Sequence, residues 1–235
     1  MARVLAVGVY LADRPNAAAH LSYELAGSAK HTVVQRWIAL APDGKGRAAL
    51  PNTELVVTKP TPKFSLLDRV IQDAADFDWL VLCDDDVEVG RDFVDRLIDL
   101  SDHFDFALSQ PARTADSFTD HSIVQVLPGL LARRTRFVEI GPIVCIRRDA
   151  MGLLLPFGEE CGMGWGLDFI WPLKIEGAAL RMGIVDAAPV AHRIRRPAVG
   201  YDSGDAQRAM SWALAAHPHL TRDEAFTVIE AYPCL

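Results

Sequence analysis

An α/β fold with a mostly parallel central sheet and flanking helices is the fold class that the sequence predicts. Short apolar runs of strand length alternate with amphipathic stretches of helix length over the first hundred residues, which is the pattern of strand–helix–strand units with short connections. Half of the 235 residues are hydrophobic and 23% are charged, as is usual for a chain that buries a core. Because neither an internal repeat nor a linker divides it, we expect one domain over 1–235.

The first half carries the regular part of this pattern. Residues 4–10 form an apolar run that ends in a polar loop, as buried parallel strands do, and 79–83 (WLVLC) run directly into Asp84. Further elements are expected as strands at 32–40 and 54–58, a turn at 41–46, and helices at 16–26 with Asn16 as N-cap, at 65–74 with a capping box of Ser65 and Asp68, and at 91–103.

The second half is less regular, and a Gly-rich segment at 158–168 (GEECGMGWGLD) interrupts it. The expected elements are strands at 107–110, 136–148 and 183–185, a loop at 188–197, and helices at 121–127, from 168 onward, at 204–216 and at 222–230.

Charge and cysteine usage exclude several classes of function. The formal net charge is −7, and no basic stripe suited to a nucleic-acid backbone is present. The four cysteines are widely spaced and form no CxxC pair, which indicates reduced thiols in a cytoplasmic protein. No apolar run approaches the ~20 residues that a transmembrane helix needs, so we expect no membrane span.

Three consecutive aspartates, Asp84, Asp85 and Asp86, follow the apolar strand at 79–83. Adjacent carboxylates repel one another unless a cation or strong donors lie close by. Mg²⁺ and Mn²⁺ bind carboxylate oxygens and can bridge them to phosphates. Since open α/β sheets bind ligands at the carboxyl ends of their strands, the triplet is a candidate metal and phosphate site. The alternative is an exposed acidic turn.

A second candidate segment is 162–172 (GMGWGLDFIWP). Its glycines let the backbone approach a ligand, and Trp165 offers a flat face on which a sugar ring can stack. Asp168 stands at the start of a helix, where a carboxylate can accept a proton as a general base. The alternative is that Asp168 simply caps the helix and that Trp165 and Trp171 belong to the core.

His192 follows an apolar strand, and its neutral imidazole could complete a metal shell if the fold brings it to the aspartates. Arg193, Arg195 and Arg196 come next and could pair with a diphosphate. The alternatives are a structural histidine and a solvated basic loop.

Glu139 interrupts a β-rich run just before Gly141 and Pro142, which indicates a pocket wall that contacts polar groups of an acceptor. It could equally face solvent from a half-exposed strand. Lys63 is a candidate nucleotide contact, although lysines at such positions are mostly solvated.

Taken in order, these segments resemble the GT-A glycosyltransferases, and within them family 2-like bacterial enzymes. The resemblance covers about residues 3–200 and rests on the apolar strand with DDD at 79–86, FVEIGP at 137–142, GWGLD at 164–168 and the VDAAPVAH run that ends at His192. It implies a Rossmann-like single domain in which 1–110 bind the nucleotide-sugar. A small antiparallel sheet on the acceptor side belongs to 111–200, and helices at 201–235 close the chain.

The resemblance also implies roles for individual residues. Asp86 and His192 would ligate Mn²⁺ or Mg²⁺, and Asp84 would lie towards the donor ribose. Asp85 fits either role, because a triplet leaves the DxD frame open. Asp168 would be the base, although Leu167 stands where many relatives have the Glu of a Glu-Asp pair.

At the end of the first strand, Tyr10 and Arg14 fall where the family contacts the nucleotide base. The expected activity is inverting transfer of a sugar from a nucleotide-sugar, with UDP the commonest donor nucleotide in the family, to a carbohydrate or other hydroxyl acceptor. Two alternatives are a haloacid dehalogenase-like phosphohydrolase and a nucleotide-sugar-binding module without catalysis. The first places a DxD after a buried strand, but it usually carries Thr or Val where Glu88 stands here.

Overall fold

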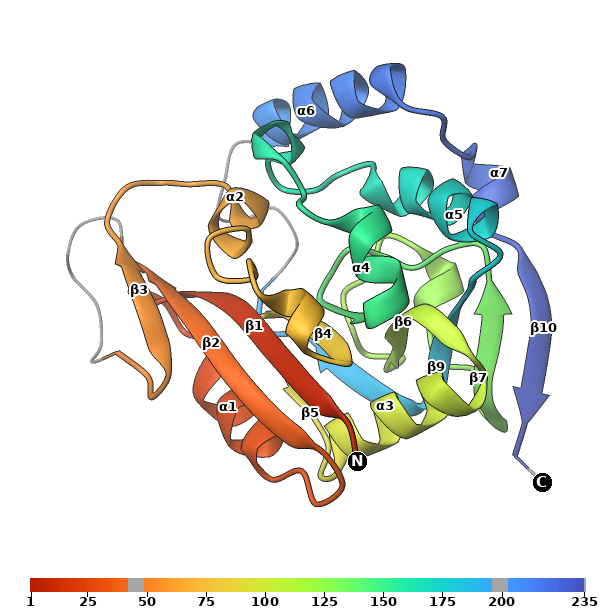
Figure 1. Cartoon of the computed structure of the whole chain (residues 1–235), viewed down its shortest axis with the longest axis horizontal. Coiled ribbons are helices and arrows are strands. Elements are labelled where there is room, and N and C mark those ends of the chain that lie inside the picture. The colour runs from red at the N-terminus through yellow and green to blue at the C-terminus, as the bar shows by residue number, and fades with distance from the viewer. Residues whose placement is uncertain (42–48, 196–202, 235) are drawn as a thin grey trace.

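The computed structural model describes residues 1–41, 49–195 and 203–234 (Figure 1). The strands are β1 (Arg3–Leu11), β2 (Thr32–Leu40), β3 (Thr53–Val57), β4 (Trp79–Asp84), β5 (Val87–Val89), β6 (Phe106–Arg113), β7 (Leu130–Thr135), β8 (Ile143–Arg147), β9 (Arg181–His192) and β10 (Val228–Pro233). The α-helices are α1 (Ala18–Ala26), α2 (Lys63–Leu67), α3 (Phe93–His103), α4 (Arg148–Leu154), α5 (Leu167–Gly177), α6 (Ser203–Ala216) and α7 (Arg222–Ala225), and the 3-10 helices are η1 (Ala74–Asp76), η2 (Ser122–Val124) and η3 (Glu159–Cys161).

Within the described ranges, the strands form one mixed sheet in the order β10-β7-β9-β6-β8-β4-β1-β2-β3, with β5 added against β9. The strands β3, β2, β1 and β4 are parallel to one another. β8 runs antiparallel between β4 and β6, and β7 and β10 run antiparallel at the opposite edge. The predicted α/β fold with a parallel core is therefore confirmed, and the antiparallel strands continue the same sheet.

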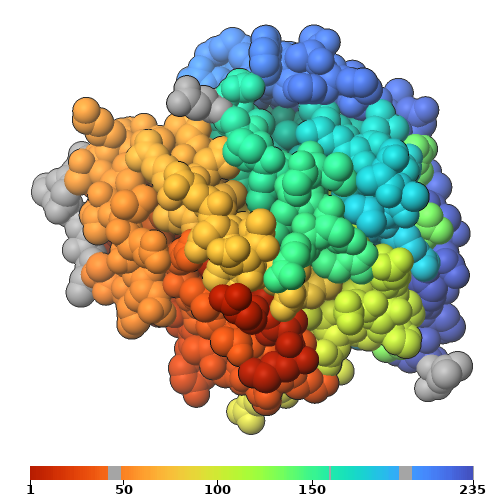
Figure 2. Space-filling view, viewed as in Figure 1, coloured from red at the N-terminus to blue at the C-terminus, as the bar shows by residue number. Residues whose placement is uncertain are grey.

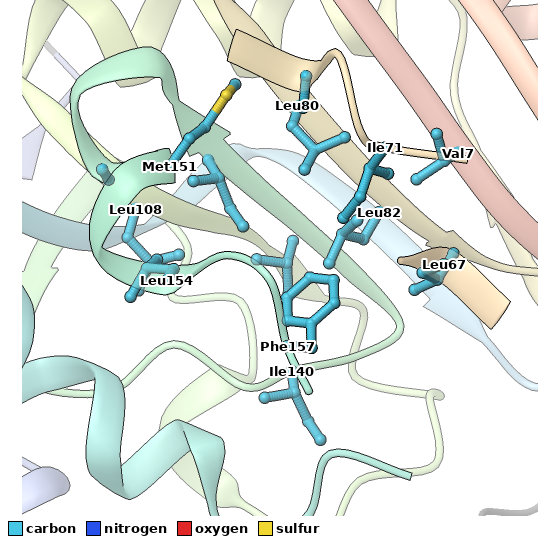
Figure 3. Close-up of a cluster of buried hydrophobic side chains, with 14 of the residues drawn as sticks. Val7, Leu67, Ile71, Leu80, Leu82, Leu108, Ile140, Met151, Leu154 and Phe157 are labelled. Carbon is cyan, nitrogen blue, oxygen red and sulfur yellow. The ribbon is translucent and has the colours of Figure 1, made fainter. Parts of the chain in front are cut away.

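Helices cover both faces of the sheet, and β1 shows why. Its side chains alternate between two apolar clusters: Leu5 and Val7 face α2, α4 and α5, whereas Val4 and Ala6 face α1 and α3. All four are fully buried, and burial of a Val or Leu side chain is worth about 1.5–3 kcal/mol. Figure 3 shows the first cluster, in which strand residues such as Leu82 meet Phe157 and neighbouring side chains.

The helix expected at 65–74 is shorter and begins earlier. Pro62 is the N-cap of α2, the helix ends at Leu67, and no capping box forms at Ser65. Asp68 instead accepts hydrogen bonds from the N–H groups of Phe157 and Gly158, both at 3.0 Å. The carboxylate that the sequence assigned to a helix cap therefore holds the loop that leads into the Gly-rich segment.

The strand expected at 136–148 is confined to β8. It begins after Pro142, which has no N–H to donate to a strand ladder, and the chain then turns into α4, a helix that the sequence analysis missed. The strand β7 was also missed.

Two expected helices are largely absent. Only η2 forms within 121–127, because Arg133 donates to the carbonyls of Ile123 and Gln125, each at 2.9 Å, and Asp186 accepts from the Leu127 N–H at 2.8 Å. The helix expected at 222–230 is α7 alone, after which β10 pairs with β7.

The remaining expectations concern a turn, a loop and the absence of a membrane span. The turn expected at 41–46 falls almost wholly outside the described residues. The loop expected at 188–197 is partly strand, since β9 continues to His192. No helix in the described part of the chain combines the length and the apolar character that crossing a membrane requires.

Candidate active site

A large cavity lies at the carboxyl ends of β1 and β4, between the sheet, α5 and α6. Its volume is about 1370 Å³. The residues that the sequence analysis proposed for the site mostly line it: Lys63, Asp84, Asp85, Asp86, Glu139, Trp165, Asp168 and His192. The fold thus brings together candidates from five separate segments of the chain.

Asp84, the last residue of β4, forms an ion pair with Lys63, the first residue of α2. The Asp84 side chain is 30% exposed and that of Lys63 12%, so the pair belongs to the cavity wall. Gly141 makes room for it, because a Cβ at that position would lie 2.8 Å from Asp84 Oδ2. A donor that reaches Asp84 therefore meets a carboxylate that already has a cationic partner.

Asp85 is held by its surroundings. Its carboxylate accepts the Leu11 N–H at 2.7 Å and pairs with Arg195, which also donates to the Pro15 carbonyl at 3.0 Å. Burial raises the pKa of Asp85, and Arg195 acts against this. These contacts favour the frame in which Asp84 and Asp86 are the ligand-facing members of the triplet. Arg196 lies outside the described residues.

Asp86 lies beside His192 because β5 pairs with β9 and sets Val87 opposite His192. The distance from His192 Nε2 to Asp86 Oδ1 is 3.3 Å, and Arg195 Nη2 lies 3.3 Å from Oδ2. Burial acts to raise the pKa of Asp86, but His192, Arg195 and Lys63 outweigh it, so the pKa is lowered. Asp86 is therefore ionised at neutral pH.

Asp86 and His192 fit a divalent metal as a pair. Asp86 Oδ1 is buried and faces His192 Nε2 at 3.3 Å, and carboxylate oxygen and imidazole nitrogen both ligate divalent ions. Among the residues described, no group of three or more His, Cys, Asp or Glu side chains is placed to hold a metal. A metal held here would thus take two ligands from the chain and the remainder from phosphate and water.

Asp168 lies in the first turn of α5 and is 6% exposed. It does not cap the helix: Gly166 is the N-cap, and no side-chain cap bond forms. Asp168 Oδ1 has no hydrogen-bond partner. Burial raises the pKa of Asp168 to about 7, against the opposing effect of backbone N–H groups in the same turn. A buried carboxylate of this kind in a cavity is suited to exchanging a proton with a ligand.

Glu139 points inward rather than to solvent, with its side chain 13% exposed. Burial raises its pKa to about 7, although Arg113 acts against this. Arg113 Nη2 lies 2.6 Å from Glu139 Oε2 and also donates to the Gly141 carbonyl at 3.0 Å. The sequence analysis missed Arg113, a buried arginine at the end of β6; the only signal was a charge at the end of an apolar strand.

Trp165 is half-buried, lines the cavity and packs against the first apolar cluster. The preceding Gly164 has φ +82°, and a Cβ there would lie 2.3 Å from the Phe64 ring, so only glycine fits between α2 and the loop. Trp171 is 1% exposed, as the core alternative predicted for it.

Tyr10 and Arg14 do not line the cavity. The Tyr10 side chain is buried, and its hydroxyl bonds Thr53 Oγ1 at 3.0 Å and the Leu50 N–H at 3.1 Å. Arg14 is exposed and lies 3.9 Å from Asp13. Their contact with a nucleotide base stays a prediction.

Comparison with known proteins bears on the fold. No protein-family model matches the chain, and no curated protein matches it. A structure of GalNAc-T7 with UDP, GalNAc and Mn²⁺ matches with a TM-score of 0.54 and 13% identity over 85% of this chain. A structure of TarS residues 1–349 from S. aureus with UDP-GlcNAc matches with a TM-score of 0.53 and 9% identity over 89% of this chain. The fold is GT-A-like.

The same TarS segment in complex with UDP matches with a TM-score of 0.52 and 10% identity over 94% of this chain. The chain spans 45% of the GalNAc-T7 structure and 65–68% of the two TarS structures. At these identities the likeness establishes the GT-A-like fold alone.

Proposed function

We propose that this chain is a metal-dependent glycosyltransferase that moves a sugar from a UDP-sugar to a hydroxyl acceptor with inversion at the anomeric carbon. The observation that carries the proposal is the meeting, in one cavity, of a buried carboxylate whose Oδ1 has no hydrogen bond (Asp168) and a carboxylate–imidazole pair (Asp86 and His192). The first suits a base, and the second suits the metal-bound diphosphate of a donor.

The chain supplies a proton acceptor and cationic groups for a single displacement. Asp168 takes the proton of the acceptor hydroxyl as its oxygen bonds to the anomeric carbon, and the bond to the departing diphosphate oxygen breaks. Lys63 pairs with Asp84 and Arg195 pairs with Asp85, so both place positive charge beside the aspartate triplet, where the diphosphate leaves. Mn²⁺ or Mg²⁺ bound at Asp86 and His192 would add Lewis-acid stabilisation of that leaving group.

The free cysteines bear on the cellular compartment, and the matched structures bear on the choice between a transferase and a phosphohydrolase. All four cysteines are free thiols, in keeping with a cytoplasmic enzyme. The matched structures with UDP or UDP-sugar argue for the transferase over a phosphohydrolase. A phosphohydrolase would turn over a generic aryl phosphate, and a binding module would bind a donor without transferring or hydrolysing it.

The test is a thermal-shift screen of UDP, GDP and their sugars, each with and without Mn²⁺. We expect a UDP-sugar to raise the melting temperature in a Mn²⁺-dependent way, since a ligand that binds only the folded state stabilises it. The Asp86→Asn variant should lose this dependence, whereas Asp149→Asn, an exposed aspartate paired with Arg147, should keep it. An unchanged Mn²⁺ effect in Asp86→Asn would contradict the metal site, and a product with retained configuration would contradict Asp168 as base.

A further inference from the structure

The cavity is larger than a donor requires. Ligand pockets usually measure about 300–1,000 Å³, and this one measures about 1370 Å³. The groups assigned to the donor lie around the triplet at the ends of β1 and β4. Much of the remaining lining comes from the Gly-rich loop before α5 and from α6, so a second ligand has room between these two elements.

The helix α6 packs directly on the loop that leads to Asp168. A Cβ at Gly166 would lie 3.4 Å from Met210 and from Leu214, and one at Gly162 would lie 3.6 Å from Ala209. In Figure 1, α6 lies beyond α5 and away from the sheet, and in Figure 2 it forms one edge of the molecule. The side of the cavity next to the loop that leads to Asp168 is therefore formed by a helix outside the main layers, and that helix contributes aliphatic side chains to it.

Three apolar side chains on this side of the cavity, one from the Gly-rich loop and two from α6, form an apolar wall that does not belong to the core. Met163, Met210 and Leu214 line the cavity and are half-buried. None of them belongs to any of the three hydrophobic clusters formed by the described residues. Methionine adapts its shape to varied apolar ligands, and polar groups such as Gln207 and Thr221 are exposed at the same cavity.

We propose that this wall binds the apolar part of the acceptor, so that the hydroxyl that receives the sugar belongs to an alkyl or aryl compound or to its glycoside. The inference rests on the proposed function, since Asp168 as base fixes where the hydroxyl lies. Met210 and Leu214 pack beside Gly166, two residues before Asp168, and line the same cavity. An acceptor whose hydroxyl reaches Asp168 therefore has these two side chains available for dispersion contacts. Saccharide hydroxyls that face Met163, Met210 and Leu214 would be left without hydrogen-bond partners.

The test measures binding and transfer separately with glucose and its methyl, butyl, hexyl and octyl β-glucosides, all below micelle-forming concentrations. Calorimetric titration without donor gives the dissociation constant, and product formation with UDP-sugars gives kcat/KM. Burial of a methylene is worth about a fourfold change in affinity, so we expect the dissociation constant to fall about fourfold per methylene over the first few. We expect kcat/KM to rise in parallel.

Variants locate the effect. Met210→Gln should flatten the dependence of affinity on alkyl chain length. Met163→Gln should do the same, and because Met163 lies in the Gly-rich loop, this variant tests the wall without altering α6. The matched control is Trp212→Gln, a 53% exposed apolar residue of α6 that does not line the large cavity and should keep the dependence. Equal affinities for methyl and octyl glucosides, or an unchanged dependence in both methionine variants, would overturn the inference.

The two proposals fail in different ways. Transfer at equal rates to methyl and octyl glucosides would contradict the apolar acceptor wall and leave the transferase standing. Binding that depends on chain length and on Met210, with no transfer from any nucleotide-sugar, would leave the apolar ligand site standing and contradict the transferase.

Discussion

Replacement of Asp168 by asparagine should slow sugar transfer by orders of magnitude and, at the same time, stabilise the fold at neutral pH. The carboxylate is buried without a hydrogen bond at Oδ1, so its ionised form carries a desolvation penalty that the folded protein must bear. The loss of a general base lowers the rate by about 10²–10⁴. A substitution that raises stability and lowers activity is typical of a residue that serves catalysis at a cost to the stability of the fold.

The size of the stability effect follows from the pKa. The Asp168 carboxyl has an ordinary pKa of 3.8, which the fold raises to about 7. Between these values the folded protein keeps a proton that the unfolded chain has released, so stability falls as pH rises from about 4 to about 7 and is level above that. At ~1.36 kcal/mol per pH unit the loss sums to about 4 kcal/mol. Asparagine does not titrate and escapes this loss.

Urea unfolding of the wild type and the Asp168→Asn variant at pH 5 and pH 8 measures the effect. The advantage of the variant should be about 3 kcal/mol larger at pH 8 than at pH 5, whereas the exposed Asp149→Asn control should show no such growth. An advantage that is equal at the two pH values would refute the raised pKa. In the wild type, kcat should rise with pH and level off above about 7, because the ionised carboxylate is the active form.

Two further substitutions test contacts around the site. Gly141→Ala should weaken UDP binding in calorimetry with little change in the fold, because its Cβ would lie 2.8 Å from Asp84 Oδ2; Gly152→Ala, which has open space around it, is the control, and equal affinity in both would contradict the reasoning. Arg133→Met should lower the free energy of unfolding in urea by about 3–5 kcal/mol. The change removes the guanidinium that lies 2.9 Å from Asp186 Oδ2 and leaves that buried carboxylate charged without its partner. The double change with Asp186→Leu should recover part of this loss, and no recovery would argue against an electrostatic cause.

The parallel half of the fold could be read from local sequence. Each of its strands is an apolar run bounded by turn residues, and the observed β1, β2, β3 and β4 lie within about a residue of the predicted ranges. The position of Asp84 at the end of a buried strand follows from the same runs. For β1 and β4, burial on both faces of a parallel sheet leaves a pattern that no distant contact needs to complete.

The second half depends on partners that are distant in sequence. β7 contains Arg133 and Arg134 and does not look like a buried strand, yet Arg133 is 2% exposed because Asp186 and two backbone carbonyls accept its hydrogen bonds. Arg113 is buried for a similar reason, through Glu139. Local periodicity does not contain such pairs, so it misassigned the elements around them.

The candidate site shows the same division. The triplet and the loop of Asp168 were found from their own sequence, but the approach of His192 to Asp86 depends on the register of β5 against β9. The role of α6 in the cavity wall left no local signal beyond the apolar face of a helix. The roles of these residues in catalysis stay predictions.

The three adjacent aspartates each find a partner from elsewhere in the chain: Lys63 for Asp84, Arg195 for Asp85 and His192 for Asp86. Two of these partners lie more than a hundred positions downstream, so a fragment that ends before β9 would keep Lys63 but lose the partners of Asp85 and Asp86. The predicted donor half (1–110) and acceptor half (111–200) are therefore not expected to be exchangeable parts. We expect chimeras that join 1–110 of this chain to the second half of another protein to fail unless the graft brings an arginine and a histidine to the same two positions.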